Sequence, residues 1–346
     1  MQPLDRRSFL RRSASCAAHL SLLAASPGLA RRVFAADGRR PIVAQEPWGR
    51  IEEVGDGLWA LISTPLQDRT TLCNGGIVRG RSAVAVVESF AQPDGAAWLA
   101  EQARTLTGRW PDIAVLTHYH GDHAAGVEGY ARDGGATRVH LTEPTRELIR
   151  AQDARRDTPP APERVRLLDG ADVIDTEGPV VLDLGGRSVR VVPYDGHTAS
   201  DVTIELEEPA VVWCGDLVWN RMVPNYVDAV PSRLGGAVRA LVRSTDTTYI
   251  PGHGPIADAA ALRVYLDLLD DIEAAARRAH ESGTSAAAAA AEYVPPAATA
   301  DWTVFSPRYF EVAIGAWLRE IREGNRVNDR SVGTNGTQPF GGIVVS

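Results

Sequence analysis

The sequence predicts an α/β protein built as a four-layer α/β/β/α sandwich (αββα). The chain has 346 residues, of which 44% are hydrophobic and 23% are charged, so it can bury a large core. From about residue 50, short runs of β-branched residues alternate with Ala-rich segments of helical periodicity. The strand-rich runs form two halves, each closed by helices, which is the pattern expected of two packed sheets with helices outside them.

The first strand-rich half leads into a His-rich turn. Segment 94–106 is predicted to be a helix because Ala96, Leu99 and Ala103 recur on one side. Segment 113–116 is a short apolar run, typical of a buried strand, that ends directly at the turn. The expected strands of this half are 57–63, 76–78, 83–88, 113–116 and 138–141, and its expected helices are 94–106 and 122–132.

The second half follows the same alternation. Its longest helix is predicted over 256–280, where Leu262, Tyr265 and Leu269 recur at core spacing. Four further strand runs precede the helices, and one lies between them. The expected strands are 180–184, 188–194, 202–206, 210–213 and 247–250, and the expected helices are 235–243, 256–280, 285–291 and 317–321.

One domain is expected to contain both halves, over residues 37–324. Segment 153–163 is rich in Pro and charge and is predicted to be a loop, a candidate flap over one sheet edge. Residues 325–346 are rich in Gly, Asn and Thr and are predicted to be a flexible tail.

The first 36 residues resemble a twin-arginine signal peptide. Arg6 and Arg7 precede a mildly apolar Ala/Leu/Ser stretch that is too short and too polar to span a bilayer comfortably. We expect cleavage after Ala35, with Ala30 as the alternative, and an ordinary amphipathic helix as the alternative to a leader. The implied partner is the twin-arginine translocase. The mature protein is then expected to be periplasmic or otherwise exported, without stable membrane insertion.

The composition excludes several classes of function. All 36 basic residues are Arg, so catalysis by a Lys Schiff base and a phosphate-loop Lys are both excluded. Removal of the leader takes away six Arg and one Asp, which changes the formal net charge from −8 to −13. No basic run remains, so nucleic acid is not expected as a partner. Three Cys, one of them in the leader, cannot form a disulfide framework.

Five of the eight His lie in three short motifs, each just after an expected strand. The motifs are THYHGDH at 117–123, DGHT at 195–198 and PGHGP at 251–255, and a fourth, CGDL at 214–217, contains Asp instead of His. Loops that follow strands of packed sheets gather at one edge, so five His and two Asp are expected to form one site. Imidazole and carboxylate suit two borderline cations that share a water molecule.

This set of residues resembles the complete ligand set of the metallo-β-lactamase superfamily, over residues 50–280. That family has an αββα sandwich with its metals at one edge of the sheets. The resemblance implies that His118, His120 and His197 hold a first metal, that Asp122, His123 and His253 hold a second, and that Asp216 bridges them. It also implies two Zn²⁺ per subunit, with iron or manganese as alternatives.

The resemblance implies a hydrolase that uses no Ser or Cys nucleophile. Two cations near one water lower its pKa, so that hydroxide forms at neutral pH and attacks a carbonyl group that one metal polarises. Asp122 and Asp216 are the expected catalytic carboxylates. Asp122 is expected to orient the hydroxide, and either Asp122 or a metal-bound water is expected to protonate the leaving group.

The expected bridging residue, Asp216, narrows the range of substrate classes for the expected hydrolase. Class B β-lactamases carry Cys or Ser at that position, so the chain is more similar to the glyoxalase II and lactonase-like branches. The expected reaction is cleavage of an ester, thioester, lactone or similar acyl bond in a small molecule, although the expected export weighs against glutathione thioesters. The alternatives are β-lactam hydrolysis, a persulfide dioxygenase with one iron on His118, His197 and Asp216, and a non-catalytic metal-binding protein.

Residues beside the ligands are expected to complete the site. Substrate contacts are predicted for Tyr119, Trp219, Asn220 and Tyr226, which lie next to ligands or just after Asp216. Glu88 stands where relatives commonly carry an Asp that supports a ligand His, so it departs from the family pattern. Structural roles are predicted for His140, His280 and Cys214.

Overall fold

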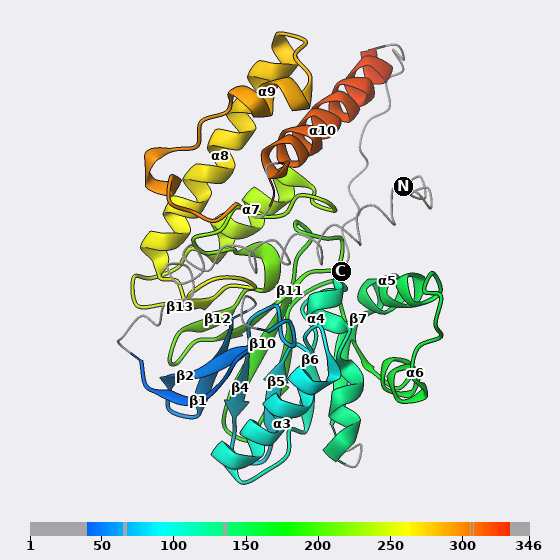
Figure 1. Ribbon diagram of the computed structural model, residues 1–346, viewed down its shortest axis with the longest axis vertical. Helices are drawn as coiled ribbons and strands as arrows, with labels where there is room; N and C mark the ends of the chain where they lie inside the picture. Colours follow the sequence, from blue (N-terminus) through cyan, green and yellow to red (C-terminus); the bar gives the residue numbers. More distant parts are fainter. Residues whose placement is uncertain (1–39, 65–67, 134–136, 305, 307, 333–346) are drawn as a thin grey trace, which may run out of the picture.

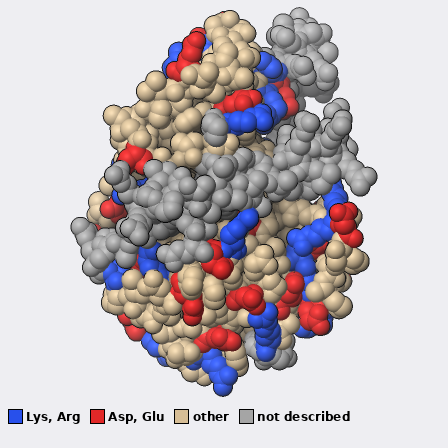
Figure 2. Space-filling view, in the orientation of Figure 1, with Lys and Arg blue, Asp and Glu red and all other residues tan. Residues whose placement is uncertain are grey.

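The computed structural model describes residues 40–64, 68–133, 137–304, 306 and 308–332 (Figure 1). The expected signal peptide, residues 1–36, lies outside this range. No helix of the described part is long and apolar enough to cross a membrane. On the face shown in Figure 2, acidic and basic side chains alternate over the described elements, with no large patch of one sign.

The first sheet contains eight strands within the described residues, in sequential order. The strands β1 to β5 pair antiparallel, and β5 to β8 pair parallel. They are β1 (Ile42–Glu46), β2 (Gly49–Gly55), β3 (Leu58–Ser63), β4 (Gly75–Arg79), β5 (Val84–Val87), β6 (Ile113–Val115), β7 (Arg138–Thr142) and β8 (Asp172–Ile174).

The second sheet has five described strands in the order β13-β12-β11-β10-β9. All neighbours are antiparallel except β12 and β13, which are parallel. The strands are β9 (Val180–Asp183), β10 (Ser188–Pro193), β11 (Val202–Leu206), β12 (Val211–Trp213) and β13 (Thr248–Ile250).

The two sheets pack face to face around an apolar layer. Strand β3 alternates, so that Leu58, Ala60 and Ile62 face the second sheet while Trp59 and Leu61 face the helix side. A strand that is covered on both faces is apolar at nearly every position, and the sequence of β3, LWALIS, has this composition.

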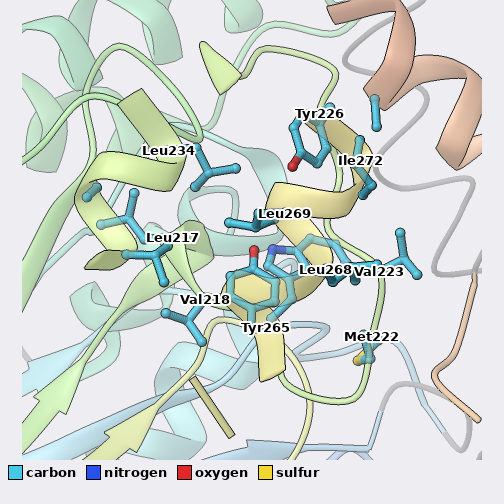
Figure 3. Close-up of a cluster of buried hydrophobic side chains, with 14 of the residues drawn as sticks. Leu217, Val218, Met222, Val223, Tyr226, Leu234, Tyr265, Leu268, Leu269 and Ile272 are labelled. Atoms are coloured by element: carbon cyan, nitrogen blue, oxygen red, sulfur yellow. The ribbon is translucent and has the colours of Figure 1, made fainter. Parts of the chain in front are cut away.

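Helices cover the outer faces of both sheets, which confirms the αββα prediction (Figure 1). The first sheet is covered by α3 (Pro93–Thr107), α5 (Glu143–Asp153) and α6 (Pro162–Asp169). The second carries α7 (Pro231–Leu241) and α8 (Ala259–Glu281), with α9 (Ala286–Glu292) and α10 (Tyr309–Val332) packed beside α8. Figure 3 shows Leu268, Leu269 and Ile272 of α8 inside this second core.

The predicted helix over 122–132 is wrong. The chain forms a single turn, α4 (Gly121–Ala124), and then the 3₁₀ segment η1 (Val127–Asp133). Gly126 separates them and lies against the segment that precedes α3, where an added Cβ would be 2.3 Å from the carbonyl oxygen of Gln92. A tertiary contact therefore interrupts a pattern that is locally compatible with one helix.

The predicted loop at 153–163 and the predicted tail need smaller corrections. Helix α5 ends at Asp153 and α6 begins at Pro162, so residues 154–161 form the connection. The N-cap of α5 is Thr142, whose Oγ1 accepts a hydrogen bond from the Thr145 amide.

Helix α10 continues to Val332, into the predicted tail, because no Gly or Pro occurs between residues 325 and 332. Residues 333–346 of that tail lie outside the described part. Strands β1, β2 and β8 and helices α5 and α6 were not predicted.

Candidate dinuclear metal site

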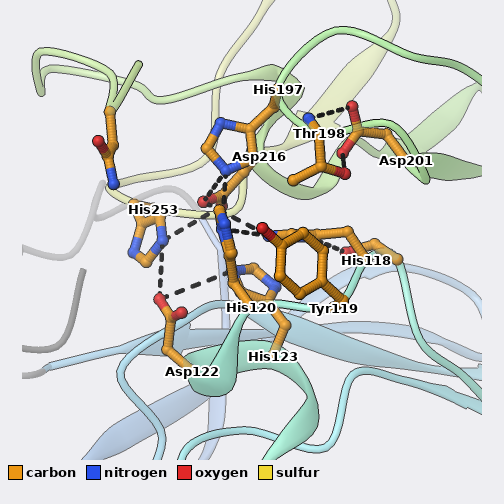
Figure 4. A network of polar contacts seen from close by, with 12 residues as sticks. His118, Tyr119, His120, Asp122, His123, His197, Thr198, Asp201, Asp216 and His253 are labelled. Atoms are coloured by element: carbon orange, nitrogen blue, oxygen red, sulfur yellow. Dashed lines mark hydrogen bonds and ion pairs between the residues drawn. The ribbon is translucent and has the colours of Figure 1, made fainter. Parts of the chain in front are cut away.

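Four loops bring seven His and Asp side chains together at one edge of the sandwich (Figure 4). The loops follow β6, β10, β12 and β13, as the sequence motifs predict. All seven side chains are buried, and their donor atoms form two groups, within each of which every atom lies within 4.8 Å of the others. The first group is His118, His120, His197 and Asp216, and the second is Asp122, His123 and His253.

The first group converges on the Nδ1 atom of His120. This atom lies 3.1 Å from Nε2 of His118 and 3.0 Å from Nε2 of His197. His118 and His120 alternate in an extended turn, so both rings can point into the same space. Three ring nitrogens thus face one point beside the Asp216 carboxylate.

The second group is built around the short helix α4. Asp122 and His123 are neighbours on α4, and His253 approaches from the loop after β13. The Oδ2 atom of Asp122 lies 3.3 Å from Nε2 of His253 and 3.7 Å from Nε2 of His123. This group therefore combines donors from both sheets.

Asp216 lies between the two groups. Its Oδ2 atom is 3.2 Å from Nε2 of His197 and 3.8 Å from Nε2 of His118. Its Oδ1 atom is 3.1 Å from Nε2 of both His123 and His253. One carboxylate oxygen thus faces each group, which is the arrangement required of a bridging ligand.

The donor set fits two cations. Five atoms that face the shared centre are buried and have no hydrogen-bond partner among the described residues. They are Oδ2 of Asp122, Nε2 of His123, both carboxylate oxygens of Asp216 and Nε2 of His253. A buried polar atom without a partner is costly, and cations held by imidazole and carboxylate would remove that cost.

Neighbouring charges shift the pKa values of several donors. Burial alone would lower the pKa of His253, but Asp216 and Asp122 outweigh it and raise this pKa to about 9. Burial likewise opposes ionisation of Asp122, but His123 and His253 lower its pKa to about 2. Burial and the neighbouring His123 lower the pKa of His118 well below its usual value. Ionised carboxylates and a neutral His118 imidazole are the forms that bind metal, whereas His253 must lose its proton before it can bind.

The comparison with known families agrees with this geometry. The model of the metallo-beta-lactamase superfamily matches residues 69–258, more than half of the chain. The chain belongs to the metallo-β-lactamase superfamily. The match includes all seven donors and ends at the start of α8, so the helices α8 to α10 lie beyond it.

Two curated relatives are similar over part of the chain. One is the hydroxyacylglutathione hydrolase of Acidiphilium cryptum (strain JF-5), 29% identical over 166 residues, which are 48% of this chain and 59% of that protein. The other is the beta-lactamase-like protein 2 homolog of Caenorhabditis elegans, 23% identical over 152 residues, 42% and 43% of the two chains. The chain thus spans about half the length of these superfamily members.

Solved metallo-β-lactamases share the fold. FIM-1 from Pseudomonas aeruginosa, in the mono-zinc form, is 21% identical with a TM-score of 0.52, covering 66% of this chain and 98% of that one. The metallo-β-lactamase from Erythrobacter litoralis is 18% identical with a TM-score of 0.51, covering 66% and 99%. At these identities the similarity shows the superfamily fold alone.

In this superfamily member, Glu88 supports the second group. Its Oε1 atom lies 2.9 Å from Nδ1 of His123, and its two carboxylate oxygens also accept from the amide and hydroxyl of Thr117. Although Glu88 departs from the Asp that relatives commonly carry, its longer side chain still reaches the ligand His. Glu88 has a φ of 76°, in the left-handed region that non-glycine residues rarely adopt.

Asp228 supports the first group and was not predicted. Its Oδ2 atom lies 3.0 Å from Nε2 of His120 and accepts a hydrogen bond of 2.6 Å from the hydroxyl of Tyr119. A proton on Nε2 leaves Nδ1 of His120 free for the shared centre. Asp228 lies 12 residues beyond Asp216 in an irregular loop, so no local signal marks it.

Asp201 holds the loop that carries His197, and it was also missed. Its Oδ2 atom accepts hydrogen bonds from the amides of Gly196 and Thr198, at 3.1 and 2.9 Å. Its Oδ1 atom accepts from the Thr198 hydroxyl at 2.7 Å. The turn around His197 is thus closed by one side chain four residues further along.

Two of the four predicted substrate contacts lie beside the donors. The Tyr119 ring lies 4.7 Å from that of His120, and the Trp219 ring lies 4.1 Å from that of His253, measured between centroids. Both rings flank the donor groups, so their role as substrate contacts stays a prediction.

The side chains of the other two predicted substrate contacts have partners within the protein, and their role as substrate contacts also stays a prediction. The Asn220 side-chain amide donates to the carbonyl oxygens of Pro255 and Ile256, at 2.9 and 3.3 Å, and so holds the loop after His253. Tyr226 is buried in the second core beside α8 (Figure 3). Both follow Asp216 in sequence, and neither belongs to the two donor groups.

The residues predicted to be structural lie outside both donor groups. His140 on β7 has Nε2 3.3 Å from Oδ2 of Asp172 on the adjacent strand. His280 lies in the last turn of α8, where a basic residue suits the helix C-terminus. Cys214 is buried in the second core, as expected. Cys73, the other described cysteine, is free, and burial raises the pKa of its thiol.

Proposed function

We propose that this protein is an exported dinuclear zinc hydrolase that cleaves an ester, thioester, lactone or similar acyl bond of a small molecule. The observation that carries the proposal is the position of Asp216, whose two oxygens face two separate donor groups. His118, His120 and His197 would hold one cation, Asp122, His123 and His253 the other, and Asp216 both. Nitrogen and oxygen donors in this proportion suit zinc.

Two bound cations would supply Lewis acidity that lowers the pKa of water and polarises an acyl carbonyl group. The chain itself supplies a carboxylate that can accept a hydrogen bond from water and two further carboxylates that orient donor His rings. The Asp122 carboxyl group is ionised at neutral pH, as an Asp ordinarily is, so it can accept a hydrogen bond from the attacking water. Asp228 and Glu88 hold His120 and His123 by the ring nitrogens that face away from the centre, which orients the opposite nitrogens.

The completeness of the second donor group favours this function over a one-iron dioxygenase. A single iron on His118, His197 and Asp216 would leave four further buried donors without a role: His120, Asp122, His123 and His253. β-Lactam hydrolysis has less support, because the solved β-lactamases share the fold alone with this chain and an Asp occupies the bridging position. The hydroxyacylglutathione hydrolase similarity supports acyl hydrolysis in general.

The test begins with metal content. Elemental analysis of the purified protein should find two equivalents of zinc. Removal of the metal by a chelator should abolish the hydrolytic activity, and addition of zinc should restore it. The substrate panel should include p-nitrophenyl esters, acyl thioesters, lactones and nitrocefin, with Asp216→Ala as the inactive control. One equivalent of iron with oxygen uptake on persulfides would contradict the proposal, as would a two-zinc protein inert on the entire panel.

Export is supported by the twin Arg at positions 6 and 7 before a mildly apolar stretch. The test compares the parent with the double variant Arg6→Lys, Arg7→Lys by cell fractionation. We expect the parent in the periplasm and the variant in the cytoplasm. Equal periplasmic amounts of both would show that the twin-arginine route is not used.

A further inference from the structure

We propose that Asn74 is the positioning residue for His253, and that through His253 it sets how tightly the second donor group holds its cation. The inference rests on the proposed function, because it assigns the second group a cation. Asn74 lies just before β4 in the first sheet, whereas His253 follows β13 in the second sheet. None of the four sequence motifs contains it.

The Asn74 residue is 3% exposed, and its polar groups form hydrogen bonds with two parts of the chain, the end of β3 and the turn at 251–254. Its Oδ1 atom accepts a 2.9 Å hydrogen bond from the amide of Ser63, at the end of β3. Its Nδ2 group donates to the carbonyl oxygens of Pro251 and Gly254, both at 2.8 Å. Its backbone amide donates to the carbonyl oxygen of Gly252, also at 2.8 Å. One residue thus ties the end of β3 to the turn at 251–254.

The three acceptors in that turn surround His253 in the sequence. Pro251 and Gly252 precede it and Gly254 follows it, so Asn74 holds the backbone on both sides of this donor. Both protons of the amide group are used, and the two bonds span 177 and 180 residues. These long-range contacts fix the position of His253, a donor from the second sheet, relative to the first sheet.

The turn has little freedom on its opposite side. The Gly252 amide donates to the carbonyl oxygens of Gly215 and Val218, at 2.7 and 3.1 Å. A Cβ added to Gly252 would lie 2.0 Å from Oδ1 of Asp216. The backbone thus passes directly against the bridging carboxylate. Loss of the two Asn74 side-chain bonds would loosen the turn on one side, while the Asn74 backbone amide and the Gly215 side still held it, so His253 would tilt rather than detach.

A tilt of His253 affects one donor group selectively. Asp122 and His123 stay on α4, and the first group receives none of its side chains from the 251–254 turn. Mutation of a residue that orients a metal ligand typically lowers the metal affinity about 10- to 100-fold. The first cation is therefore expected to keep its affinity when Asn74 is changed.

The primary test variant is Asn74→Asp. The carboxylate is similar in shape and can still accept from the Ser63 amide, but it cannot donate to the Pro251 and Gly254 carbonyls. Asn74→Ser is the second variant, in case the added charge prevents folding. The matched control is Thr71→Val, because Thr71 is also buried in the same segment. Its hydroxyl is hydrogen-bonded to the Trp48 carbonyl oxygen and to the Ser63 hydroxyl, and the variant removes both bonds without touching those that Asn74 makes to the turn.

The readout is zinc stoichiometry and affinity by competition with a chromogenic chelator, together with thermal unfolding of the chelated proteins. We expect two tight equivalents for the parent and Thr71→Val. For both Asn74 variants we expect one tight equivalent and a second weakened about 10- to 100-fold. Because Asn74 acts through His253, Asn74→Asp combined with His253→Ala should match His253→Ala alone.

Three results would overturn the inference: Asn74 variants that keep both equivalents at parental affinity, variants that lose both in parallel, or a double variant weaker than His253→Ala. A general loss of stability would be visible in the unfolding of the chelated proteins and would weaken both equivalents. A parent that binds fewer than two cations would overturn the proposed function and this inference with it.

Discussion

The carboxylate of Glu88 lies 2.9 Å from Nδ1 of His123, and the Glu88 backbone has a φ of 76°. The strained residue is therefore the one that orients a donor of the second group. The Glu88 carbonyl oxygen also accepts a hydrogen bond from the buried hydroxyl of Tyr130. Backbone strain at such a position persists when the surrounding contacts determine it.

Two substitutions separate the strain of Glu88 from its contact with His123. Glu88→Ala and Glu88→Gly both remove the carboxylate, so both should weaken the second zinc about 10- to 100-fold. Glycine adopts a positive φ without a steric cost, so the metal-free Glu88→Gly protein should have a free energy of unfolding about 1–2 kcal/mol higher than Glu88→Ala. Urea unfolding in chelator measures the difference, and equal stabilities would show that the backbone is not strained.

Gly252→Ala should disrupt catalysis through Asp216. The added Cβ would overlap Oδ1 of Asp216, so either the carboxylate or the turn must move. A displacement near 1 Å in a catalytic centre can cost about 100-fold in rate, which is the loss expected in kcat/KM on the best acyl substrate. The control is Gly236→Ala in α7, where no described atom lies within 4 Å of the new Cβ. Activity within threefold of the parent for Gly252→Ala would disprove the close approach.

Arg164 on α6 should stabilise the fold near the second group. Its Nε donates to Oδ2 of Asp153 at 2.7 Å, and its Nη1 donates to the carbonyl oxygens of Ala124 and Ala125 at the end of α4. Arg164→Ala leaves a buried carboxylate without its main partner, so the free energy of unfolding should fall by about 3–5 kcal/mol. Removing Asp153 as well, by Asp153→Ala, should recover part of this loss. Chemical denaturation compares the three proteins, and a larger loss for the double variant would contradict the account.

Asp228→Ala should weaken the first zinc about 10- to 100-fold, because His120 loses the acceptor that holds its Nε2 proton. Tyr119→Phe is the matched control, since it removes the other hydrogen bond to Asp228 but leaves the His120 contact. Chelator competition should find the second zinc unchanged in both variants. If Tyr119→Phe weakened the first zinc as much as Asp228→Ala, the contact with His120 would not be the cause.

Local patterns in the sequence predicted the layered fold and the positions of the seven donors. The strand runs and helical periodicities are visible over short windows, because apolar residues must face the core at intervals of two or of three to four residues. The donors are visible for a similar reason, since each motif directly follows a strand and contains its own turn-forming Gly. The family resemblance marked Glu88 only as a departure from the usual supporting Asp, so neither its contact with His123 nor its strained φ was predicted.

The tertiary structure decided the contacts that hold those donors. Asn74 reaches the His253 turn across 177 residues, and Asp228 reaches His120 across 108, so neither pairing has a local signature. The same limit explains the wrong prediction of one helix over residues 122–132: Gly126 interrupts it because of the segment packed against it. Hydrophobic period and turn chemistry act between residues that are close in sequence. Hydrogen bonds between loops depend on how the two sheets stack, and that is set by the whole chain.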